Sequence, residues 1–177
     1  MTQILWINGA FGSGKTTTTQ KLVESIPAAR IFDPEIVGFM LRHYITEPIK
    51  DFQDWPAWRG LVPEVAAQML RHYGGVLIAP MTILREDYLT EIRAGLTRHG
   101  IECEHVLLDV SANELTSRIE TDAVETGARQ WRLDHIETYL QNREWLLANS
   151  HVVESSKLDA DQVASAIASH LETRTLG

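Results

Sequence analysis

The residues most suited to chemistry lie near the N-terminus, where glycines, a lysine and a threonine occur at a fixed spacing. Gly9, Gly14, Lys15 and Thr16 match the pattern G-x-x-x-x-G-K-[ST] at every fixed position. Glycines let backbone N–H groups turn toward an anion, and a helix starting at Lys15 would point the positive end of its dipole at the same place. The lysine adds a point charge, and the threonine hydroxyl is a ligand for Mg²⁺. The pattern therefore predicts a binding site for the phosphates of a nucleotide and its metal ion.

The surrounding sequence supports this motif against the alternative of a chance glycine-rich turn. The apolar segment Ile4–Ile7 precedes the motif as a predicted strand, and a helical stretch follows it to about Ser25. The pattern is typical of proteins that bind ATP or GTP, and ATP is the nucleotide that we expect. The residues expected to bind it are Gly9, Ala10, Phe11, Gly12, Ser13, Gly14, Lys15, Thr16 and Thr17. Thr16 is also the expected ligand of Mg²⁺.

Two acidic residues are candidates for phosphoryl transfer from such a nucleotide. A kinase needs a carboxylate near the acceptor hydroxyl and positive charge over the transferred group, a role that we assign first to Lys15. Asp33, Pro34 and Glu35 follow the second predicted strand, so they should lie at the same sheet edge as the glycine loop. Asp33 is the candidate for accepting the substrate proton or for holding Mg²⁺ through water, and Glu35 is the reserve. Helices also commonly begin with these residue types, so capping is an alternative that is compatible with catalysis.

Further positive charge is expected from arginines in the C-terminal half of the chain. Arg118, Arg129 and Arg132 flank a polar stretch that contains a glycine, and Arg143 follows on the next predicted helix. We interpret residues 118–132 as a lid that closes arginines over the phosphates, with Arg118 and Arg132 as catalytic candidates. The alternative is a solvated helix face on which the arginines form ordinary ion pairs.

The segment between the second and third strands, residues 34–74, is rich in aromatic and basic side chains and is interpreted as a helical region that covers the acceptor. Aromatic faces can stack on a base or a sugar, and guanidinium groups can bind its polar atoms. The alternative is a helical hairpin that packs its aromatic residues into the core. The residues expected to contact the acceptor are Glu35, Phe39, Arg42, Trp58, Arg59 and Thr82. Thr82 stands at the end of the third strand, where no aspartate is present to bind metal.

The elements that must position these residues are short apolar runs separated by stretches of helical periodicity. The predicted strands are 4–7, 29–33, 76–79, 105–108 and 151–153. Continuous apolar strands alternating with helices indicate a parallel sheet that is covered on both faces, with ligands bound at the carboxyl ends of the strands. We therefore predict one α/β domain over residues 1–177, a three-layer P-loop fold of the nucleotide-kinase type with a five-stranded parallel sheet. The helix after Pro56 is expected to break and restart at Pro63.

The composition of the chain limits the kinds of partner and the cellular compartment that we expect. The net charge of −8 disfavours sequence-independent binding to nucleic acid or to an anionic membrane, so we expect a small-molecule substrate and no nucleic acid. No apolar run reaches the length of a membrane span. Cys103 is the single cysteine, which excludes an internal disulfide and, with the absence of a signal peptide, favours the cytoplasm. Nothing in the sequence indicates an oligomeric state.

Several segments together resemble the tunicamycin-resistance proteins, which are P-loop proteins related to nucleoside and small-metabolite kinases. The segments that carry the resemblance are Leu5–Thr16, Asp33-Pro34-Glu35 with Gly38-Phe39, Asp51-Phe52-Gln53 with Trp58-Arg59, and Pro80–Ile83. In the lid, Arg118 and Trp131 match more loosely. The resemblance implies ATP binding and protection against tunicamycin, an antibiotic that contains uridine.

Three functions are compatible with these observations. The first is a phosphotransferase that uses ATP and Mg²⁺ to modify tunicamycin or another nucleoside-like compound. The second is an ATP-dependent protein that sequesters the drug without modifying it, an alternative kept open by the missing acid on the third strand. The third is a housekeeping metabolite kinase.

Overall fold

The computed structural model describes residues 3–123 and 126–175 and contains a five-stranded, all-parallel sheet in the order β2-β3-β1-β4-β5. The strands are β1 (Ile4–Gly9), β2 (Ala29–Ile31), β3 (Val76–Pro80), β4 (Cys103–Asp109) and β5 (His151–Glu154). The helices are α1 (Lys15–Ser25), α2 (Pro34–Leu41), α3 (Pro56–Tyr73), α4 (Glu86–Arg98), α5 (Ala112–Thr121), α6 (Arg129–Ala148) and α7 (Ala160–Thr175). Two short 3₁₀ helices, η1 (Phe52–Asp54) and η2 (Thr126–Ala128), lie in the connections.

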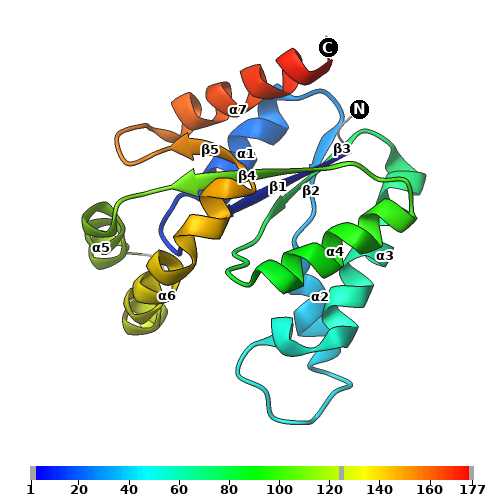
Figure 1. Cartoon of the computed structure of the whole chain (residues 1–177), viewed down its shortest axis with the longest axis horizontal. Coiled ribbons are helices and arrows are strands. Elements are labelled where there is room, and N and C mark those ends of the chain that lie inside the picture. The colour runs from blue at the N-terminus through cyan, green and yellow to red at the C-terminus, as the bar shows by residue number, and fades with distance from the viewer. Residues whose placement is uncertain (1–2, 124–125, 176–177) are drawn as a thin grey trace.

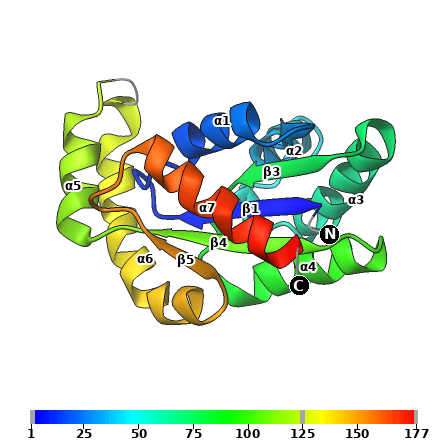
Figure 2. The same ribbon diagram turned by 90° about the horizontal axis from the view of Figure 1, so that it is seen from above.

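Helices cover the sheet on both faces, which gives three layers (Figure 1 and Figure 2). Along the central strand β1, Leu5 and Ile7 belong to the core beneath α1 and α7. Ile4 and Trp6 point to the opposite face, where α3 and α4 cover them. This alternation follows from the two-residue period of a strand, and burial on both faces explains why the strand is apolar at every position from 4 to 7. The predicted α/β fold with a five-stranded parallel sheet is confirmed.

One helix differs from its prediction. Helix α3 runs without a break from Pro56 to Tyr73 and passes through Pro63, where we expected a restart. Pro63 is buried and faces Gly95 of α4 so closely that a Cβ on that glycine would lie 2.5 Å from the proline ring. Packing of α3 against α4 thus offsets the hydrogen bond that the proline cannot donate. Within the described residues, no helix has the length and apolarity needed to cross a bilayer.

A tight contact in the helical region predicts a measurable loss of stability. A Cβ added to Gly38 of α2 would lie 2.6 Å from the ring of the buried Phe52. We therefore expect Gly38→Ala to lower the free energy of unfolding by about 1–3 kcal/mol, measured by urea denaturation. Gly60 of α3 is the matched control, because a Cβ there meets nothing within 4 Å. Gly60→Ala should raise stability by about 0.5–1 kcal/mol, and equal effects of the two changes would contradict the packing argument.

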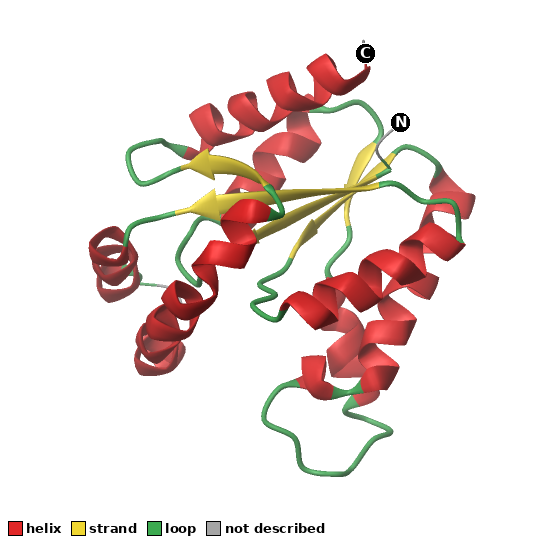
Figure 3. Cartoon of the chain, in the orientation of Figure 1, coloured by secondary structure: helices red, strands yellow, loops and turns green. Residues whose placement is uncertain are grey.

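Most of the predicted site residues lie in the segments that follow the carboxyl ends of the strands. Figure 3 shows the loops that follow β1, β3 and β4 leaving the same end of the sheet. The loop after β1 begins α1, the segment after β2 begins α2, and the loop after β3 leads into α4. Parallel strands with right-handed crossovers bring these segments together, although they are distant in sequence.

Candidate functional site

The glycine loop turns in a backbone conformation that only glycines adopt easily. Gly9 and Gly14 have φ angles of 149° and 91°, and Gly14 is the residue before the first turn of α1. A Cβ on Gly9 would lie 2.8 Å from the carbonyl oxygen of Leu108 in β4, so the loop runs directly against the neighbouring strand. The loop therefore has bare backbone at its glycines, at the N-terminal end of a helix, which is suited to phosphate.

The side chains of the loop fit a nucleotide and its metal ion. Lys15 Nζ donates hydrogen bonds to the carbonyl oxygens of Gly9 at 3.0 Å and Ala10 at 2.8 Å, which folds the ammonium group over the loop. The Ser13 hydroxyl is buried and has no hydrogen-bond partner within the described part of the chain. A buried hydroxyl without a partner is costly in a closed structure, and a phosphate oxygen would satisfy it. Thr16 is exposed at the start of α1, where its hydroxyl can ligate Mg²⁺.

Protein ligands for a metal are otherwise scarce. Across residues 3–123 and 126–175, no three His, Cys, Asp or Glu side chains form a group that could hold an ion. Mg²⁺ typically binds one or two protein oxygens and keeps several waters and phosphate oxygens as its other ligands. Thr16 as the direct protein ligand is therefore compatible with this ion, and the assignment stays a prediction.

A buried asparagine, which sequence analysis missed, holds the loop in place. Asn8 Oδ1 accepts hydrogen bonds from the backbone N–H groups of Gly9 at 2.8 Å and Ile83 at 3.0 Å. Its Nδ2 donates to the Ile83 carbonyl oxygen at 2.8 Å. The Thr82 hydroxyl donates to the Gly9 carbonyl oxygen at 2.7 Å and is itself buried. Thr82 thus supports the loop in this structure, and its expected contact with the acceptor stays a prediction. The one sequence signal for this role was that Asn8 is a polar residue at the end of an otherwise apolar strand.

His105 of β4 completes this support beneath the loop. Its Nε2 lies 3.1 Å from Asn8 Nδ2, and its Nδ1 lies 3.0 Å from the Asn149 carbonyl oxygen. A neutral ring that donates through Nδ1 and accepts at Nε2 satisfies both contacts. Burial lowers the pKa of His105 from 6.5 to about 4, because the charged form is poorly solvated there.

This shift predicts that acid destabilises the protein through His105. Between about pH 6.5 and about pH 4 the unfolded chain binds a proton at this residue and the folded chain does not. Stability therefore falls as the pH decreases through this window, by about 3 kcal/mol in total from this group. Urea unfolding of His105→Gln should show a smaller loss between pH 7 and about pH 4 than the parent protein. An unchanged pH dependence would contradict the assignment.

Asp33 occupies the position expected of it at the start of α2. It is the N-cap residue, and its Oδ1 accepts a hydrogen bond from the Glu35 backbone N–H at 2.9 Å. The capping alternative is thereby confirmed, and the predicted catalytic role is neither excluded nor tested by it. Asp33 is partly exposed, and its Oδ2 has no hydrogen-bond partner among the described residues. Glu35 is also partly exposed in the first turn of the helix.

The aromatic and basic cluster divides into buried and exposed members. Trp58 is fully buried and donates its indole N–H to the Pro34 carbonyl oxygen at 2.9 Å, so it cannot contact a substrate. Arg59 is also buried, with its guanidinium bound to Glu91 and to the Gln53 carbonyl oxygen, both at 2.6 Å. These two predictions are corrected, because both side chains fasten α3 to its neighbours.

Two members of that cluster remain available to a ligand. Phe39 is 49% exposed on α2, and Arg42 is exposed directly after the helix. The Arg42 guanidinium lies 5.6 Å from the centre of the Phe52 ring, which orients it. Their predicted contact with the acceptor stays a prediction.

The arginines expected over the phosphates are held at separate places. Arg118 donates to Glu114 at 2.7 Å and to the Ser155 carbonyl oxygen at 2.9 Å, beside the end of β5. Arg132 is buried and donates to Asp122 at 2.7 Å, which joins α5 to α6. The ion-pair alternative therefore describes both arginines in this structure, and a catalytic role would require the segment to rearrange. Residues 124 and 125 of the predicted lid lie outside the described residues.

Arg143 and Asp109 form a further pair at the end of β4. Arg143 Nε and Nη2 donate to the two carboxylate oxygens of Asp109 at 2.8 and 2.5 Å, and the Tyr139 hydroxyl donates to Oδ1 at 2.6 Å. The hydrogen bond from Arg143 lowers the pKa of Asp109, with a smaller contribution in the same direction from Tyr139. Both carboxylate oxygens are occupied, so Asp109 contributes to structure in this state rather than to metal binding.

Comparison with known proteins places the chain among P-loop domains. The chain belongs to the AAA domain family, whose model matches residues 4–146. The five-stranded parallel sheet is that of the P-loop kinases, as solved structures of sugar and shikimate kinases show. A comparison with curated proteins gives no match.

Among solved structures, the resemblance to tunicamycin-resistance proteins is confirmed. The tunicamycin resistance protein of Deinococcus radiodurans is 28% identical, with a TM-score of 0.76 over 97% of this chain and 96% of that chain. A sugar kinase from Janibacter sp. HTCC2649 is 17% identical, with a TM-score of 0.65 over 97% and 95% of the two chains. Shikimate kinase from Bacteroides thetaiotaomicron is 12% identical, with a TM-score of 0.62 over 98% of each chain. The two kinases support the fold alone.

Proposed function

We propose that this chain is a phosphotransferase that uses ATP and Mg²⁺ to phosphorylate tunicamycin or a related nucleoside-like compound. The observation that carries the proposal is the glycine loop, with its folded-over Lys15 and unpartnered Ser13 hydroxyl, combined with Asp33 at the carboxyl end of β2. The likeness to the tunicamycin resistance protein of Deinococcus radiodurans supports the choice of acceptor. A cytoplasmic location accompanies the proposal, because ATP is supplied there.

Each residue near the loop has a distinct role in this proposal. The loop amides, Lys15 and Ser13 hold the phosphates, and Thr16 binds Mg²⁺. When bound, ATP supplies the phosphoryl group that passes to the acceptor hydroxyl, with ADP as the leaving group. Asp33 accepts the proton of that hydroxyl, since a carboxylate with one oxygen fixed by the helix cap and the other open is rigidly oriented. Phe39 and Arg42 contact the acceptor from α2.

Mass analysis tests the proposal directly. Purified protein is incubated with tunicamycin and Mg·ATP, and the drug is recovered and compared with a sample incubated with a non-hydrolysable ATP analogue. The expected result is a gain of one phosphoryl group that depends on ATP and on Asp33. Stoichiometric binding with the drug recovered intact would overturn phosphoryl transfer in favour of sequestration. A product formed only from other metabolites in a substrate panel would indicate a housekeeping kinase.

A further inference from the structure

Phe11 occupies a position in the glycine loop that the motif leaves open to any residue. Its ring nevertheless contacts two rings of α6. The centre of the Phe11 ring lies 4.6 Å from that of Trp131, at an angle of 62°, and 5.6 Å from that of His135, at an angle of 89°. Both are edge-to-face arrangements, which are favourable for aromatic pairs. The loop is therefore fastened to α6 by a side chain that phosphate binding alone does not require.

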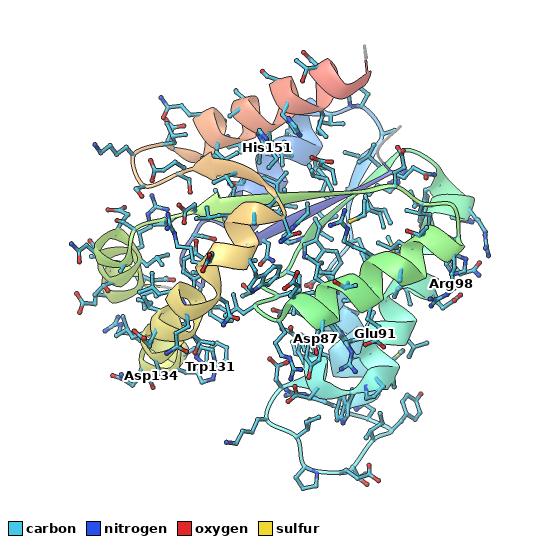
Figure 4. All side chains as sticks on the ribbon, in the orientation of Figure 1. Asp87, Glu91, Arg98, Trp131, Asp134 and His151 are labelled. Atoms are coloured by element: carbon cyan, nitrogen blue, oxygen red, sulfur yellow. The ribbon has the colours of Figure 1, made fainter. Side chains whose placement is uncertain are left out.

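The two rings on α6 are themselves held in place. Trp131 and His135 lie one helical turn apart with their ring centres 3.9 Å apart, and His135 Nδ1 donates to the Trp131 carbonyl oxygen at 2.6 Å. Trp131 is nevertheless 51% exposed. Figure 4 shows it on the side of α6 nearer to α4, with Asp134 on the other side of the helix. Phe11 thus contacts a fixed pair of rings on α6.

The face of the Phe11 ring lies beneath the lysine of the motif. Lys15 Nζ is 5.6 Å from the ring centre, which is within the range of a cation–π interaction. The same ammonium group donates to the carbonyl oxygens of Gly9 and Ala10. One ring therefore joins α6 to the charged group that is expected to bind the phosphates.

The next residue of the loop packs against α5. A Cβ added to Gly12 would lie 3.1 Å from the side chain of Ile119, which is fully buried. Adjacent loop residues thus contact α5 and α6 separately. Closely packed side chains transmit a displacement instead of absorbing it, so a shift of either helix would change the loop.

We propose that Phe11 is a positioning residue that couples the phosphate-binding loop to α6, with Trp131 as its anchor. The inference rests on the nucleotide binding of the proposed function and deepens it, because it names how occupancy of the loop is linked to α6. The ring keeps Lys15 and the loop close to the binding conformation, so less freedom is lost when the phosphates bind. The coupling is reciprocal, because a nucleotide that changes the loop also changes the surroundings of Trp131.

Calorimetry with Mg²⁺ and a non-hydrolysable ATP analogue tests the effect on binding. Phe11→Ala and Trp131→Ala should each weaken binding about threefold to tenfold, the range of one aromatic or cation–π contact. The double variant should bind like Phe11→Ala, because both changes remove the same contact. Phe11→Tyr keeps the ring and should keep the affinity, whereas Phe11→Leu keeps only the apolar volume and should not.

Leu140→Ala is the matched control for Trp131→Ala. Leu140 is an exposed apolar residue of the same helix, about two and a half turns after Trp131 and therefore on the opposite side of α6. Its replacement should leave binding of the analogue unchanged.

Acrylamide quenching of tryptophan fluorescence tests the reciprocal effect. All tryptophans of the chain lie within the described residues, and Trp131 is the exposed one; those that are buried or partly buried are Trp6, Trp55, Trp58 and Trp145. Saturation with the Mg²⁺-bound analogue should change the quenching of the parent protein, and Trp131→Phe should abolish the change. Phe11→Leu should reduce the change at equal saturation, because the ring that links the loop to Trp131 is gone.

The outcomes separate this inference from the proposed function. The coupling would be overturned by any of three results: single variants that bind within about twofold of the parent, additive losses in the double variant, or unchanged quenching. Each of these results leaves the phosphate site itself standing. Absence of binding by the parent protein would instead refute the nucleotide site, and with it both the proposed function and the coupling.

Discussion

Lys15→Ala is expected to reduce the affinity for Mg·ATP by about a hundredfold or more, the largest single effect on binding that we predict. The Lys15 ammonium lies over the loop and donates hydrogen bonds to two backbone carbonyl oxygens. Its positive charge offsets the repulsion between these oxygens and an incoming phosphate. Removing the charge leaves a concentrated negative ligand facing backbone carbonyls, with only amide dipoles to stabilise it. Isothermal titration with Mg·ATP measures the change, and with Mg·GTP it measures the nucleotide preference.

Lys21→Ala provides the matched control for that experiment. The Lys21→Ala substitution removes the same charge from the same helix. The Lys21 ammonium, however, forms an ion pair with Asp161 of α7 at 3.1 Å, away from the loop. Its replacement should change affinity for the nucleotide less than twofold, because an exposed ion pair contributes little. Urea unfolding of both variants separates binding from stability. Undiminished heat from Lys15→Ala would refute the assignment of the loop and, with it, the proposed function.

The sequence predicted the features that depend on local signals. The glycine loop is local, because its backbone angles need glycine at particular positions whatever surrounds them. The strands were recognisable because both faces of the sheet are covered and most strands contain a short continuous apolar run, such as Ile4–Ile7 in β1 and residues 106–108 in β4. The cap at Asp33 was also predictable, because its hydrogen bond lies within one helical turn.

Features that depend on packing between elements were not predictable in this way. Trp58 and Phe39 are both aromatic residues of the acceptor-covering region, yet one is fully buried and the other is half exposed. The difference arises because Trp58 lies on the face of α3 that meets Pro34, a relation that no short pattern encodes. Likewise, Arg132 was expected over the phosphates, but its partner Asp122 lies at the end of the preceding helix. Continuity of α3 through Pro63 depended on a glycine in α4, thirty-two positions away.

Asp33→Asn is the change expected to separate catalysis from binding. Asparagine caps helices about as well as aspartate, so α2 should keep its start and the protein its stability. The amide cannot accept the proton of the acceptor hydroxyl, and loss of a general base typically lowers the rate by about a hundredfold to ten-thousandfold. We therefore expect kcat for tunicamycin phosphorylation to fall by this factor, while the affinity for Mg·ATP changes less than about twofold.

Asp159→Asn makes the same chemical change at the cap of α7, where Asp159 accepts a hydrogen bond from the Gln162 backbone N–H at 2.8 Å. That helix lies on the opposite face of the sheet from α2, so kcat should be unaffected there. Comparison of the two variants separates the effect of losing the carboxylate near the glycine loop from the effect of changing a helix cap. If Asp33→Asn retained full turnover, Asp33 would be a helix cap alone and Glu35, one helical position beyond Pro34, would be the next carboxylate to replace.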